Sequence, residues 1–161
     1  YTSKNVKYII APHNMKGSQI TNLVSKLVVK TVLYSEMDGK SLSEYSVFVI
    51  DTIGLLSKIY SYADISYVGG AMGTTGLHNI LEPAVFGVPI IIGKEYSKFP
   101  EAFDMIENGG LISIKNYDEL ETTLNSIIDD LLKRKTLGTA NANFILKNKG
   151  AVIQILDYIR I

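Results

Sequence analysis

Six short apolar segments, each rich in β-branched residues, recur along this chain and are separated by stretches of helical character. The segments are 6–10, 31–34, 47–50, 65–68, 88–92 and 111–114. Leu23, Leu27 and Val28 illustrate the intervening pattern, in which apolar residues recur three or four positions apart and mark one face of a helix. Strands that alternate with helices predict right-handed crossovers and a parallel sheet. We therefore expect an α/β fold, a Rossmann-like doubly wound sheet of about six parallel strands followed by C-terminal helices.

The fifth segment and the C-terminal third refine this expectation. Residues 88–92 are apolar at successive positions, which is typical of a strand buried on both faces. Asn116 can cap a helix with Glu119 three residues on, and Gly138 is expected to interrupt the helical pattern that follows. A last amphipathic stretch is expected to pack against the sheet or a neighbouring domain through Ala151, Val152, Ile155, Leu156 and Ile159.

Composition restricts the classes of function. With 161 residues, 47% of them hydrophobic, the chain is expected to form a single domain over 1–161. Sixteen basic residues balance sixteen acidic ones, so no nucleic-acid partner is expected. The absence of cysteine and the presence of only two histidines predict no metal site. No apolar run reaches the roughly 18 to 20 residues of a membrane span, which predicts a soluble chain. Because the sequence enters its first strand almost at once and lacks a starting Met, it could be a piece of a longer protein.

The two most unusual loops follow the first and the fourth strand. If the strands have the order 3-2-1-4-5-6, these loops meet at the point where the order reverses and where ligands bind. The first loop, 11–17, contains Pro12 and His13. The second, 69–79, contains four glycines and two threonines. Its backbone amides suit a phosphate group, and the alternative is a plain tight turn. Neither GxGxxG after the first strand nor GxxxxGK[ST] is present, which argues against an NAD-binding domain and a Walker-type ATPase.

Asn79 and Glu82 lie three residues apart, next to the glycine-rich loop, where Pro83 places a helix start near Asn79. Glu82 could accept hydrogen bonds from two ribose hydroxyls, while His78 and Asn79 reach a phosphate or sugar oxygen. The alternative is structural, with Asn79 capping the helix and Glu82 interacting with its dipole.

His13 allows two interpretations, a ligand donor or a surface histidine. Asp51 and Thr52, which follow the third strand, are expected mainly to cap the next helix. Gly54 would allow a close backbone approach.

Four stretches together resemble a known family. Residues 51–54 (DTIG), 60–70 (YSYADISYVGG), 76–84 (GLHNILEPA) and 86–89 (FGVP) resemble the C-terminal half of 3-deoxy-D-manno-octulosonic acid (Kdo) transferases. These are lipopolysaccharide enzymes of Gram-negative bacteria with a GT-B fold. The resemblance runs in order from about residue 10 to the C-terminus.

The resemblance implies a site for the CMP part of the donor, CMP-Kdo, made of three loops. In the family, a Pro-Arg pair, a Met-Gly-Glu stretch and an Asn-x-Leu-Glu run hold CMP. The matching positions, with three further residues of the glycine-rich loop, are Pro12, His13, Ile53, Gly54, Leu55, Gly70, Gly76, His78, Asn79, Ile80, Leu81 and Glu82. His13 stands where Arg is usual, which removes a bidentate grip on phosphate, Ile53 replaces Met, and Leu55 replaces Glu and removes a polar contact.

The resemblance also implies the reaction. Family members transfer Kdo from CMP-Kdo to a lipid A precursor (lipid IVA) with inversion and without a metal or cofactor. Amides of the glycine-rich loop and the following helix end would stabilise the charge that develops on CMP. The general base belongs to an N-terminal domain that this chain lacks, so the chain is expected to be the donor-binding part and inactive alone. The full-length enzyme is expected on the cytoplasmic face of the bacterial inner membrane. The alternatives are a GT-B domain that uses a UDP- or GDP-sugar, and a non-catalytic regulatory module.

Overall fold

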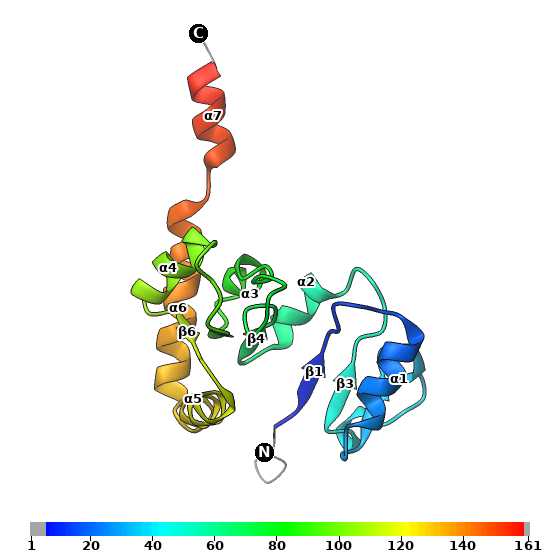
Figure 1. Cartoon of the computed structure of the whole chain (residues 1–161). Coiled ribbons are helices and arrows are strands. Elements are labelled where there is room, and N and C mark those ends of the chain that lie inside the picture. The colour runs from blue at the N-terminus through cyan, green and yellow to red at the C-terminus, as the bar shows by residue number, and fades with distance from the viewer. Residues whose placement is uncertain (1–5, 160–161) are drawn as a thin grey trace. The chain divides into compact units, whose positions relative to one another are not determined.

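The structure, a computed structural model, describes residues 6–159, apart from the side chains of residues 151, 152 and 154. Figure 1 gives the order of the elements along the chain. The chain divides into two compact units, unit 1 up to Leu56 and unit 2 from Ser57. Each unit has its own three-stranded parallel sheet and its own core, and each is described by itself below.

Unit 1 contains a parallel sheet with the strand order β1-β3-β2. Its main elements are β1 (Tyr8–Ile10), α1 (Gly17–Ser25), β2 (Thr31–Leu33) and β3 (Val47–Val49), with single 3-10 turns η1 (Tyr34–Glu36) and η2 (Leu42–Glu44). The expected order, with the second strand in the middle, is wrong here. The third strand is central and pairs with both β1 and β2, and its Val47 and Val49, 3% and 0% exposed, pack against Ile20 of α1.

Unit 2 contains a parallel sheet with the strand order β4-β5-β6, as expected for the second half of the chain. Its first elements are η3 (Tyr60–Tyr62), β4 (Ser66–Val68), α3 (Leu81–Val85), β5 (Ile90–Ile92), α4 (Pro100–Glu107) and β6 (Leu111–Ser113). The helices α5 (Tyr117–Asp129), α6 (Leu131–Asn148) and α7 (Ala151–Ile159) follow, and the short helix α2 (Leu56–Ile59) begins at the boundary of the units. The six parallel strands and the C-terminal helices confirm the predicted fold class, although the strands form two sheets of three.

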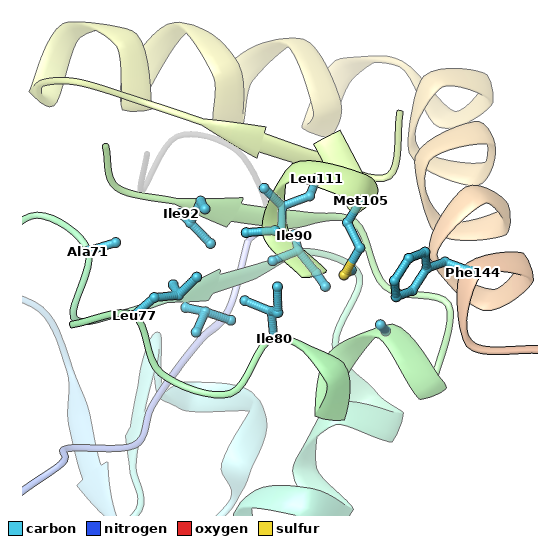
Figure 2. Packing of buried hydrophobic residues seen from close by; sticks show 11 residues of the cluster. Ala71, Leu77, Ile80, Ile90, Ile92, Met105, Leu111 and Phe144 are labelled. Atoms are coloured by element: carbon cyan, nitrogen blue, oxygen red, sulfur yellow. The ribbon is translucent and has the colours of Figure 1, made fainter. Parts of the chain in front are cut away.

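The central strand of unit 2, β5, is buried on both faces, which confirms the prediction for residues 88–92. Ile90 and Ile92 face a cluster that includes residues of the glycine-rich loop, α3, α4 and α6 (Figure 2). Ile91 faces the opposite way, toward Ile127 of α5. All three isoleucines are at most 1% exposed. Helices thus cover both faces of this sheet, which leaves its strand ends as the places where loops reach solvent.

The C-terminal helices begin and end at capping residues. Asn116 accepts a hydrogen bond from the Glu119 amide at 2.9 Å, and Glu119 accepts one from the Lys115 amide at 2.8 Å, which confirms the predicted cap. The expected interruption at Gly138 is wrong, because α6 continues through it. The break lies at Asp130, whose side chain accepts from the Lys133 amide at 2.9 Å and starts α6.

The last helix, α7, carries exposed apolar side chains. Ile155, Leu156 and Ile159 are 57%, 48% and 69% exposed, so they do not pack against the sheet, and packing against a neighbouring domain stays a prediction. The side chains of Ala151 and Val152, which were expected on the same face, lie outside the described residues. Across residues 6–159, none of the helices combines the length and the apolar character that crossing a bilayer requires.

Candidate functional site

The glycine-rich loop, residues 69–79, closes on itself at the carboxyl end of β4. The His78 amide donates to the Gly69 carbonyl at 3.1 Å, which brings the two ends of the loop together. Gly70 has a φ of +94°, and a Cβ atom at this position would lie 1.9 Å from the carbonyl oxygen of Gly76. The closed shape therefore requires glycine at position 70, for its conformation and for the space beside it.

The base of this loop is anchored in the core of unit 2, while its tip is exposed. Ala71 and Leu77 are 0% and 5% exposed and pack in the cluster around β5 (Figure 2). The Ala71 carbonyl accepts from the Glu95 amide at 2.8 Å, which ties the loop to the segment after β5. A Cβ at Gly93 would lie 2.4 Å from the same carbonyl group. The loop thus spans the carboxyl ends of β4 and β5 and presents residues 72–75 to solvent.

Asn79 and Glu82 contact each other next to this loop. Asn79 donates through Nδ2 to Oε1 of Glu82 at 3.0 Å, and its Oδ1 accepts from the Leu81 amide at 3.0 Å. The Asn79 side chain thus satisfies the first helical amide, although the N-cap residue of α3 is Ile80, which makes no side-chain cap. The helix begins at Leu81, close to the predicted start near Asn79. Glu82 lies in the first turn of α3 and is half-buried.

Tyr60 is a residue of this region that the sequence analysis missed. It lies in η3, which packs against α3. Burial, and then the negative charge of Glu82, raise the pKa of Tyr60. The phenol therefore stays protonated at neutral pH and can donate. Tyr60 is the first residue of the stretch 60–70 that resembles the family, but the sequence analysis assigned it no role.

The remaining predicted site residues lie in unit 1, after β1 and β3. Parallel β1 and β3 are hydrogen-bonded neighbours, and the Ile50 amide donates to the Ile10 carbonyl at 2.8 Å. Pro12 and His13 follow the first of these strands, and residues 53–55 follow the second, so both loops leave the same edge of the sheet. Gly54 has a φ of +89°, and Ile53 is 84% exposed. The structure thus groups the predicted residues by unit, with Gly70, Gly76, His78, Asn79, Ile80, Leu81 and Glu82 in unit 2.

Asp51 has a different role from the one expected. Its carboxylate accepts two hydrogen bonds from Ser35, from the amide at 3.0 Å and from the hydroxyl at 2.5 Å. Burial raises the pKa of Asp51, but the hydrogen bonds from Ser35 and from its own backbone outweigh this effect and lower it. Asp51 therefore links the end of β3 to η1 after β2, rather than capping α2. Within residues 6–159, no three acidic or histidine side chains gather in a way that would hold a metal ion.

Comparison with known sequences gives a consistent set of relatives. The chain is 34% identical over 116 residues to the 3-deoxy-D-manno-octulosonic acid transferase of Haemophilus influenzae, an alignment that covers 71% of this chain and 27% of that enzyme. It is 34% identical over 150 residues to the enzyme of the same name from Chlamydophila psittaci, covering 92% of this chain and 34% of that protein. The chain thus spans about a third of the length of these relatives. No family model matches the sequence.

Solved structures confirm the fold. The C-terminal CMP-Kdo binding domain of WaaA from Acinetobacter baumannii aligns with a TM-score of 0.78 at 21% identity, over 89% of this chain and 76% of that one. The C-terminal domain of a group 1 glycosyl transferase (LpcC) from Francisella tularensis aligns with a TM-score of 0.53 at 14% identity, over 92% and 90%. The arrangement of strands and helices is therefore that of the C-terminal domain of these glycosyltransferases.

Proposed function

We propose that this chain, which belongs to the 3-deoxy-D-manno-octulosonic acid (Kdo) transferase family, is the donor-binding part of an enzyme that transfers Kdo from CMP-Kdo. The observation that carries this proposal is the glycine-rich loop with the adjoining Asn79–Glu82 pair. The loop is anchored at the carboxyl ends of two parallel strands, where α/β sheets bind their ligands.

The loop would stabilise the charge that develops when the glycosidic bond of the donor breaks. The electron pair of that bond passes to the CMP phosphate, so negative charge grows beside the exposed tip, residues 72–75. Backbone amides and the Thr74 hydroxyl would donate to it, and the anchored base of the loop fixes these dipoles in advance. Because α3 has only five residues, we assign this stabilisation to the loop rather than to the helix end.

Glu82 would bind the ribose of CMP. A carboxylate can accept hydrogen bonds from two neighbouring hydroxyl groups, and Asn79 limits the rotation of this carboxylate by donating to its Oε1. We also assign to nucleotide binding the residues of the loops after β1 and β3 in unit 1, which are Pro12, His13, Ile53, Gly54 and Leu55. His13 would contact phosphate as a single donor, whereas an arginine would bind it with two.

The acceptor side of the reaction belongs to the part of the relatives that this chain does not span. We assign to it the lipid A precursor (lipid IVA), the base that deprotonates the acceptor hydroxyl, and the contact with the cytoplasmic face of the inner membrane. The 161-residue chain is accordingly proposed to bind the donor and to be inactive alone. Detectable Kdo transfer by this chain would contradict that assignment.

An amide-shift NMR titration of the chain with CMP, UMP, UDP, GDP and NAD at matched concentrations tests the proposal. Selective shifts of residues 70–82 with CMP are expected. A preference for UDP or GDP would replace the proposal with a GT-B domain of another donor specificity. Failure of every nucleotide to shift these residues would contradict donor binding by this chain. Shifts confined to helix α7 would contradict the assigned site.

A further inference from the structure

The segment that follows β5, residues 93–95, lies against the base of the glycine-rich loop. The Glu95 amide donates to the Ala71 carbonyl at 2.8 Å. A Cβ atom at Gly93 would lie 2.5 Å from the amide nitrogen of Met72, which is the first residue of the exposed tip. Lys94 stands between these two contacts, so its backbone lies beside the point where the tip of the loop begins.

The backbone of Lys94 is fixed, whereas its side chain is free to turn. The Ser113 hydroxyl of β6 donates to the Gly93 carbonyl at 3.1 Å, and the Glu95 amide is bonded to the loop, so the chain is held on both sides. Lys94 is exposed, and within residues 6–159 its ammonium group forms no ion pair. A lysine in this state offers a positive charge and three hydrogen-bond donors on a flexible stem.

The proposed donor carries a second negative charge close to its phosphate. Kdo is a 2-keto acid sugar, whose carboxylate is attached to the anomeric carbon, and in CMP-Kdo this carbon is bonded to a phosphate oxygen. The carboxylate therefore lies beside the group that the tip, residues 72–75, would bind. Two anions so close together repel each other, and a cation near both offsets that repulsion. The neutral hexose of a common UDP-sugar has no such group.

We propose that Lys94 binds the carboxylate of the Kdo unit and thereby selects a donor with an acidic sugar over one with a neutral sugar. This inference rests on the proposed function. Charge-assisted hydrogen bonds from the ammonium group would hold the carboxylate, while amides of the tip hold the phosphate. Because both groups flank the anomeric carbon, the two contacts together would fix the carbon at which the glycosidic bond breaks.

Two other charged residues of the same segment have different positions. Glu95 follows Lys94 and is exposed, but its carboxylate would repel an acidic sugar, so only its amide serves the loop. Lys98 is also exposed and precedes Phe99, whose Cζ would lie 3.8 Å from a Cβ atom at Gly76. Lys98 is therefore close to the part of the loop after the tip, whereas Lys94 is next to the first residue of the tip.

The test compares CMP-Kdo with CMP, which lacks the sugar and its carboxylate. Dissociation constants are measured by amide-shift NMR titration of the 161-residue chain and its variants. Lys94→Gln should weaken the binding of CMP-Kdo about ten-fold and leave the binding of CMP nearly unchanged. Lys94→Arg, which keeps the charge, should retain most of the affinity for CMP-Kdo. Lys115→Gln is the matched control, because Lys115 is an exposed lysine that follows β6, one strand further from the loop, and it should affect neither ligand.

The outcomes separate this inference from the proposed function. If the unmodified chain binds CMP-Kdo more tightly than CMP but Lys94→Gln keeps that preference, Lys94 does not bind the carboxylate. Equal weakening of both ligands would place Lys94 on the phosphate and would also overturn the inference, as would a loss of the preference in Lys98→Gln alone. Equal binding of CMP and CMP-Kdo by the unmodified chain would mean that it has no carboxylate site, while donor binding stands. No binding of either ligand would overturn the proposed function itself.

Discussion

Asn79 holds Glu82 through a hydrogen bond of 3.0 Å from Nδ2 to Oε1, while its own Oδ1 accepts the Leu81 amide at 3.0 Å. The side chain that satisfies the first helical amide is thus also bonded to the carboxylate, since one amide group has both an acceptor and a donor. The contact of Asn79 with a phosphate or sugar oxygen stays a prediction.

Removal of this carboxylate should weaken nucleotide binding. Glu82→Ala is expected to reduce the affinity for CMP by about 1–3 kcal/mol, because the ribose hydroxyls would lose a charged acceptor. Calorimetric titration of the chain with CMP measures the effect. Glu101→Ala is a suitable control, since Glu101 is an exposed glutamate in the first turn of α4. An unchanged affinity for Glu82→Ala would remove Glu82 from the site.

The glycine-rich loop should tolerate a methyl group at one glycine and not at another. Gly70→Ala places a Cβ 1.9 Å from the Gly76 oxygen at a φ of +94°, so the loop must change its path. We expect a loss of about 2 kcal/mol or more in the free energy of unfolding, together with amide shifts over residues 69–79. Gly73→Ala is the control, because Gly73 has open space around it and no positive φ. Urea denaturation and NMR spectra measure both effects, and similar results for the two variants would contradict the described loop.

The buried side chain of Asn141 should be important for stability. Asn141 is 0% exposed, and its Nδ2 donates to the carbonyls of Val88 at 2.7 Å and Gly110 at 2.8 Å, just before β5 and β6. Asn141→Ala removes both donors and should lower the free energy of unfolding by about 2–4 kcal/mol, as measured by urea denaturation. Asn143→Ala, an exposed position on the same helix, should change it by less than about 0.5 kcal/mol. Comparable losses in the two variants would contradict the assigned role.

The contact between Ser35 and Asp51 should make the stability of unit 1 depend on pH. The pKa of the Asp51 carboxyl is lower in the folded chain than in the unfolded chain, where it is about 3.9. The ionised carboxylate therefore stabilises the fold at pH values above the unfolded pKa, and this stabilisation is lost as the pH falls through the folded pKa. Ser35→Ala removes the hydroxyl donor at 2.5 Å and should raise the pKa of Asp51. Carboxyl ¹³C NMR titration measures this shift directly.

The same pair also gives a stability test. The difference in urea midpoint between the unmodified chain and Ser35→Ala should be larger at pH 6 than at pH 2.5, where Asp51 is increasingly protonated. Ser18→Ala, at an exposed serine of unit 1, should show no such dependence. A difference that is constant across this range would mean that Asp51 does not need its charge for the contact with Ser35.

Several particular features followed from local patterns in the sequence. Three successive isoleucines after Pro89 indicated a strand buried on both faces, because only a central strand has no wet face. The Asn116 cap was predictable because its partner, Glu119, is three residues away. The glycine-rich loop was also recognisable, because its four glycines lie within eleven consecutive residues.

Other features depended on partners that are distant in the sequence. The order β1-β3-β2 depends on how residues of all three strands pack with α1 in one core. Gly138 lies inside α6, where the absence of a side chain leaves room for the Gly87 carbonyl, which a Cβ would approach to 2.1 Å. Asp51 accepts from Ser35, sixteen residues earlier, rather than capping the helix that follows it.

The sequence by itself therefore determined the α/β class, the buried strands, the helix caps and the position of the glycine-rich loop, since each depends on residues within about one turn or one strand. Only the tertiary structure decided that η3, which holds Tyr60, packs against α3, which holds Glu82 twenty-two residues later. Such packing depends on the shapes of many side chains at once.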